Sequence, residues 1–174
     1  MLKRFMIVSL AIGFCLASVE SRATDNVELS SDNVTQVWRN INEVILVLSA
    51  NIALEDEWVE QLRNMQPTST SASEADISSE MTAFREKLNT VLASSELAPV
   101  EPPSDMPNST STLYTVTGTL LDNLIYYLIE SDSLASVAIY YGGEDMDGTS
   151  NKDVMAQVNL ANQRLEAFIV ETGL

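Results

Sequence analysis

Apolar residues recur at alternating steps of four and three along most of this chain. The clearest series is Val34, Trp38, Ile41, Ile45 and Leu48. This spacing places the side chains in one stripe along a helix. Comparable stripes predict helices at residues 32–66, 75–95, 109–141 and 151–171. No segment shows the persistent alternation of a half-buried strand, so the predicted fold class is all-α.

Residues that begin or end helices lie between these segments. Ser73 or Asp76 can cap the second helix, and Ser150 with Asp153 resembles a capping box before the fourth. A proline-rich linker at residues 98–108 separates the second helix from the third. The stripes are wide, which indicates burial against more than one neighbour. We therefore predict one domain, residues 32–174, that forms a four-helix bundle of two helical hairpins with long, short, long and short helices.

The first 23 residues have the pattern of a bacterial-type export signal. Lys3 and Arg4 precede an apolar run of about 13 residues, and Ser21 and Ala23 place small side chains before a cleavage site. The run is shorter than the roughly 20 residues that a transmembrane helix needs. We expect residues 1–23 to be removed on export to the periplasm or the medium, and residues 24–31 to form a flexible N-terminus. No stable membrane insertion is expected afterwards, although a retained anchor is the alternative.

Charge and missing residue types exclude several classes of function. The chain has 25 acidic and 9 basic residues and a net charge of −16, so it repels nucleic acid and favours basic partners or cations. It has no histidine, and its one cysteine, Cys15, lies in the signal. These absences remove histidine-based triads and histidine-ligated zinc or haem. Catalysis by paired carboxylates remains open, with the acidic group Glu55, Asp56, Glu57 and Glu60 as its candidate, but we expect a non-enzymatic protein without a cofactor.

The acidic loop at residues 143–153 partly resembles a calcium-binding loop. Asp145, Asp147 and Asn151 supply oxygen ligands at suitable spacing. The first and twelfth positions, Gly143 and Val154, have no side-chain oxygen where a calcium loop needs one. The loop is therefore interpreted either as a divalent-cation site or as a turn between helices.

Two tyrosine pairs suggest an interaction surface. In Tyr126–Tyr127 and Tyr140–Tyr141, neighbouring rings lie about 100° apart on a helix, so one of each pair should face outward. Tyrosine is common in protein interfaces. The leading hypothesis is therefore an exported bundle that acts through protein contacts or self-association.

Small-ligand binding and cation binding are the alternatives to that hypothesis. A ligand-binding or sensor bundle predicts a cavity between the helices. Four aromatic side chains would line it: Trp38, Phe84, Tyr127 and Phe168. The cation-binding alternative depends on the 143–153 loop.

Overall fold

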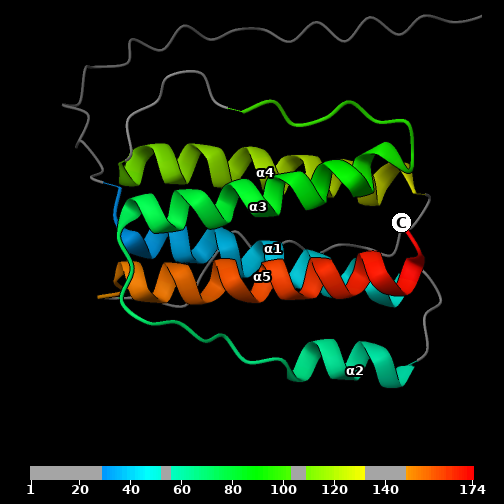
Figure 1. The fold of residues 1–174 in the computed structure, drawn as a ribbon, viewed down its shortest axis with the longest axis horizontal. Coiled ribbons are helices and arrows are strands. Elements are labelled where there is room, and N and C mark those ends of the chain that lie inside the picture. The colour runs from blue at the N-terminus through cyan, green and yellow to red at the C-terminus, as the bar shows by residue number, and fades with distance from the viewer. Residues whose placement is uncertain (1–28, 52–55, 103–108, 132–147) are drawn as a thin grey trace, which may run out of the picture.

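The computed structural model describes residues 29–51, 56–102, 109–131 and 148–174. All secondary structure in these ranges is helical, which confirms the all-α prediction. The helices are α1 (Ser31–Asn51), α2 (Asp56–Asn64), α3 (Glu74–Ala93), α4 (Thr110–Glu130) and α5 (Asn151–Thr172) (Figure 1). The expected signal peptide lies outside the described residues. No helix in the described ranges combines the length and the apolar character that crossing a bilayer requires.

Four helices of similar length, α1, α3, α4 and α5, lie side by side and run in the same direction (Figure 1). Two hydrogen bonds between helix starts show this direction. The Ser31 hydroxyl donates to Asn151 Oδ1 at 3.4 Å, and the Thr110 hydroxyl donates to Glu74 Oε1 at 3.0 Å. Helices α4 and α5 each contact both α1 and α3, so α1 lies diagonally opposite α3.

The prediction of two helical hairpins is therefore wrong. The helices expected to pair, α1 with α3 and α4 with α5, are diagonal and parallel. The first and second of the four also have nearly equal lengths, with 21 residues in α1 and 20 in α3, rather than long and short. Residues 132–141 of the predicted third helix lie outside the described residues. The connections allow this because a 20-residue helix is about 30 Å long and about ten extended residues span that distance. The 94–109 segment, with its prolines, is long enough to return the chain to the starting end.

The first predicted helix, residues 32–66, is divided into α1 and the separate helix α2. The side chain of Arg164 on α5 bonds to both Asn42 of α1 and Leu62 of α2. In one continuous helix, residues 42 and 62 would lie about 30 Å apart. Helix α2 therefore folds back against α1, and Asp56 and Glu57 occupy its first turn, where acidic residues favour the positive end of the helix dipole.

The predicted stripes form the core between α1, α3, α4 and α5. Near its centre, the rings of Trp38 and Phe84 meet edge to face, with centroids 5.1 Å apart and planes at 87°. Trp38 Nε1 is buried there without a hydrogen-bond partner. Other fully or almost fully buried side chains from the predicted series include Val34, Ile41, Ile45, Leu48, Ile77, Leu88, Val91, Leu120, Leu124, Val158, Leu165 and Phe168.

The predicted serine caps are confirmed at α3 and α5. Asp76 Oδ2 accepts hydrogen bonds from the backbone N–H and hydroxyl of Ser73 at 2.8 and 2.7 Å. Asp153 Oδ2 accepts the same two bonds from Ser150, also at 2.8 and 2.7 Å. The backbone N–H of Ser73 is the main reason why the pKa of Asp76 lies below its ordinary value, and the Ser150 hydroxyl is the main reason for Asp153. Both carboxylates therefore stay ionised where they fix the start of a helix.

Candidate functional site

A polar hollow of about 470 Å³ opens between α1, α5 and the 67–69 segment that leads from α2 to α3. It lies near the amino-terminal ends of α1 and α5. Its volume falls within the range of about 300–1,000 Å³ that is usual for small-molecule sites. The residues that line it are Thr35, Arg39, Pro67, Thr68, Ser69, Thr149, Lys152, Asp153, Ala156 and Gln157.

Two basic side chains line this hollow, Arg39 on α1 and Lys152 on α5. Both side chains are exposed. The ion pairs within the described ranges join other residues, Arg63 to Glu60 and Lys87 to Glu166. Among the described residues, nothing occupies the hydrogen-bond donors of Arg39 and Lys152, in a chain whose net charge is −16.

The carboxylates beside the hollow already accept hydrogen bonds from the protein. Asp153 bonds to its capping serine, and Asp32 Oδ1 accepts from the backbone N–H and hydroxyl of Thr149 at 2.8 and 2.5 Å. The Thr149 hydroxyl is the main cause that lowers the pKa of Asp32, followed by the backbone N–H. These contacts fasten the start of α5 to the start of α1 and shape one wall of the hollow.

A buried polar network lies behind the hollow. Asn42 Nδ2 donates to the backbone oxygen of Gln157 at 3.1 Å and to its side-chain Oε1 at 3.3 Å. Asn42 Oδ1 accepts from Arg164 Nη1 at 3.4 Å. Because a guanidinium group can only donate, this bond fixes which end of the Asn42 amide faces Gln157. The Gln157 side chain therefore uses its oxygen in the network and keeps its Nε2 donors.

The guanidinium of Arg164 attaches α2 to this network. Its side chain is buried, with 5% of its surface exposed. Nε donates to the Leu62 carbonyl oxygen at 3.1 Å, and Nη2 donates to that of Arg63 at 3.5 Å. Burial lowers the pKa of Arg164, and the nearby charge of Glu43 opposes this effect. A cation placed on the last carbonyl groups of α2 stabilises the negative end of that helix.

The attachment of α2 also positions residues 67–69, which form one wall of the hollow. Arg164 fixes the end of α2 only a few residues before Pro67. Asn159 Nδ2 then donates to the Thr68 carbonyl oxygen at 3.3 Å. One wall of the hollow is thus a loop held by two side chains of α5.

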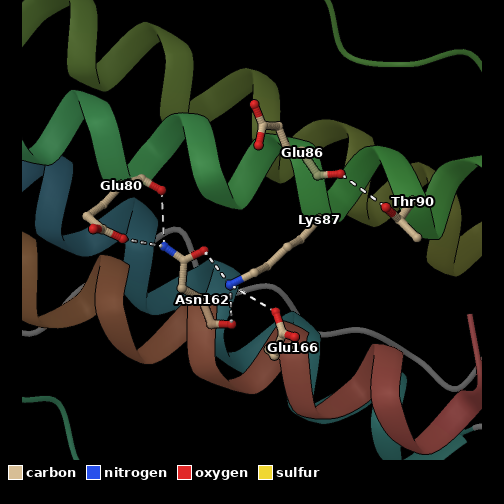
Figure 2. Close-up of polar contacts among 6 residues, drawn as sticks. All are labelled: Glu80, Glu86, Lys87, Thr90, Asn162 and Glu166. Atoms are coloured by element: carbon tan, nitrogen blue, oxygen red, sulfur yellow. Dashed lines mark hydrogen bonds and ion pairs between the residues drawn. The ribbon is translucent and has the colours of Figure 1, made fainter.

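A second polar cluster joins α3 to α5 away from the hollow (Figure 2). Asn162 Nδ2 donates to the Glu80 carbonyl oxygen at 3.0 Å. Lys87 Nζ donates to Asn162 Oδ1 at 3.4 Å and forms an ion pair with Glu166 at 3.2 Å. Because every partner is a side chain or carbonyl group of α3 or α5, this cluster sets the register of the two helices.

The predicted cation loop is only partly described. Asp145 and Asp147 lie outside the described residues, whereas Asn151 is the first residue of α5. Its Oδ1 accepts the hydrogen bond from Ser31. The described residues contain no group of three or more potential metal-ligating acidic, histidine or cysteine side chains. Cation binding by the loop stays a prediction.

The tyrosine pairs are likewise described in part. Tyr126 is 49% exposed on α4, whereas Tyr127 is 5% exposed and belongs to the core. Tyr140 and Tyr141 lie outside the described residues. An interaction at Tyr126 stays a prediction.

The expected cavity between the helices does not occur at the aromatic side chains named for it. Trp38, Phe84 and Phe168 have no exposed surface, and Tyr127 is only 5% exposed, so these side chains pack against protein atoms and do not line a cavity. Any small-ligand site on the described residues must lie elsewhere, as the polar hollow does.

The chain has no match among protein-family models, curated proteins or solved structures. Sequence reasoning missed Arg39 and Lys152 as site residues. The one feature of the sequence that could have pointed to them is the small number of basic residues in this chain. The packing of α1 against α5 is needed to place them on one hollow.

Proposed function

We propose that this chain is an exported, non-enzymatic protein whose mature part is a four-helix bundle that binds a small polar ligand. The bundle interpretation rests on four helices that share one core and each contact two neighbours. Export rests on the signal pattern of residues 1–23.

The single observation that carries the binding proposal is the hollow of about 470 Å³ between α1, α5 and residues 67–69. Three segments far apart in sequence meet there, and each is held in place by hydrogen bonds described above. A site whose walls are already fixed loses little conformational entropy when a ligand enters, which favours affinity.

A variant that fills the hollow tests this proposal. Ala156 lines the hollow, so Ala156→Trp should occupy it with an indole ring. A library of small polar metabolites is screened for ligands that raise the melting temperature. At a concentration 100 times its Kd, a ligand should raise that temperature by about 5–10 °C.

The matched control is Ala75→Trp, an exposed position in the first turn of α3. We expect a ligand to stabilise the unmodified chain and this control equally, and to have no effect on Ala156→Trp. A library that stabilises nothing, or a ligand that stabilises both variants, contradicts binding in the hollow.

Self-association or contact with another protein is the second candidate, favoured by apolar exposure on α4. Tyr126 and Ile129 are 49% and 50% exposed, and residues three apart share one face of a helix. Light scattering after size exclusion should show a dimer that dissociates in the double variant Tyr126→Ser, Ile129→Ser but not in Tyr114→Ser, which lies near the other end of α4. A monomer at every concentration contradicts self-association.

A further inference from the structure

Among the described residues around the hollow, several acceptor atoms already take part in hydrogen bonds, whereas the basic donors do not. On the acceptor side, Asp153 Oδ2, Asp32 Oδ1 and Gln157 Oε1 each accept hydrogen bonds from neighbouring protein groups. On the donor side, neither Arg39 nor Lys152 forms a hydrogen bond or an ion pair with another described residue, although the charge of Lys152 helps to lower the pKa of Asp153. The hollow thus offers more unused donors than unused acceptors.

A ligand that fits such a site must supply acceptors and negative charge. A guanidinium offers five N–H donors in a planar fork that matches two oxygen atoms of one oxyanion, and an ammonium adds three more. A neutral polar ligand could accept hydrogen bonds from these groups, but it would bring no negative charge to pair with them. The dipoles of α1 and α5 also favour a negative charge here, because both helices begin at this end of the molecule.

The rest of the surface limits the size of that anion. With a net charge of −16, the chain repels a polyanion along any part that reaches beyond the hollow. A small anion beside Arg39 and Lys152 avoids repulsion from the distant acidic residues, because charges separated by more than about 10 Å are largely screened at 0.1 M salt. The carboxylate on the lining itself is Asp153, which opposes an anion but is outnumbered there by the two cations.

We infer that the hollow binds the oxyanion group, carboxylate or phosphate, of a small organic anion, with Arg39 and Lys152 as the residues that contact it. This inference rests on the proposed ligand-binding function and names the class of ligand. Gln157 also lines the hollow, and its Nε2 is a neutral donor available to the same group.

Titration with simple probes tests the inference on the full mature chain. The probes are succinate, inorganic phosphate and glycerol phosphate, with succinamide as the uncharged counterpart of succinate. Binding is followed by ¹H–¹⁵N NMR shifts, which should be largest at Thr35, Thr149 and Gln157. Succinate and the two phosphates separate carboxylate from phosphate recognition, and succinamide should bind at least about 10-fold more weakly than succinate.

Charge-removing variants give the second arm of the test. Arg39→Gln and Lys152→Gln should each weaken binding of the preferred anion about 10–100-fold. The matched control is Arg85→Gln, which removes an equal charge at a separate apolar groove beside Val100 and Leu120. This control should leave the Kd within about twofold, since its charge lies outside the hollow.

The outcomes separate this inference from the proposed function. If uncharged ligands bind and are displaced by Ala156→Trp, while no anion binds, the hollow is a ligand site and the oxyanion inference is wrong. If anions bind equally to Arg39→Gln, Lys152→Gln and the control, the inference is also wrong. If neither charged nor uncharged probes bind, both proposals fail.

Discussion

Replacement of Phe84 by alanine is expected to lower the free energy of unfolding by about 3–5 kcal/mol. The ring has no exposed surface, and it meets Trp38 edge to face across the core. The contact joins α3 to α1, two helices on opposite corners of the arrangement. Removal of the ring therefore leaves a cavity at the centre, where four helices would have to shift together to close it.

Urea unfolding followed by circular dichroism measures this effect. Tyr126→Ala is the control, because Tyr126 is half exposed and its truncation should cost less than about 1 kcal/mol. An equally small cost for Phe84→Ala would show that the centre of the molecule is not packed as described.

Replacement of Arg164 by methionine is expected to cost about 2–4 kcal/mol and to loosen α2 in particular. Methionine keeps much of the length of the side chain but donates no hydrogen bond. The carbonyl oxygen atoms of Leu62 and Asn42 then lose their guanidinium donor. Helix α2 has only nine residues, so it has little stability of its own once that attachment is lost.

Hydrogen exchange shows where the stability is lost. Amide groups of α2 should exchange much faster in Arg164→Met, while those of α3 and α4 should change only through the global stability. Arg63→Met is the control, since Arg63 is exposed and its ion pair among the described residues is with Glu60, a contact that contributes less than about 0.5 kcal/mol. Unchanged exchange in α2 would mean that its apolar contacts at Val59 and Leu62 suffice to hold it.

Helix positions could be predicted from the sequence because they depend on local signals. The stripe that contains Ile77, Phe84 and Leu88 is buried, and the caps Ser73 and Ser150 form as expected. Helix direction could not be predicted, because an apolar stripe has the same spacing whichever way its neighbour runs. Direction is set instead by contacts between distant residues, such as Glu74 with Thr110.

The break between α1 and α2 shows a conflict between two local signals. Val59 and Leu62 continue the spacing of the first stripe, which predicts one long helix. Asp56 and Glu57 are typical of a helix start, and the structure follows that second signal. Of the acidic group considered as a catalytic candidate, Asp56 and Glu57 begin α2, whereas Glu55 lies outside the described residues.

The hollow could not be predicted, because its walls come from residues 35–39, 67–69 and 149–157. No regular spacing connects these segments. The burial of Arg164 could not be predicted either. It adjoins the apolar stripe at Leu165, and charged residues in that position usually reach the solvent. Only the return of α2 against α1 brings carbonyl oxygen atoms to its guanidinium group.

Parallel packing gives the two ends of the molecule opposite backbone charges. Each helix has a backbone charge of about +0.5 at its start and −0.5 at its finish, so four aligned helices sum to a dipole on the order of 300 debye over 30 Å. An antiparallel arrangement would cancel most of it. None of α1, α3, α4 and α5 has a basic residue in its last turn, so no side chain there offsets the negative pole. The free carbonyl groups at that pole depend on water and counterions for their neutralisation.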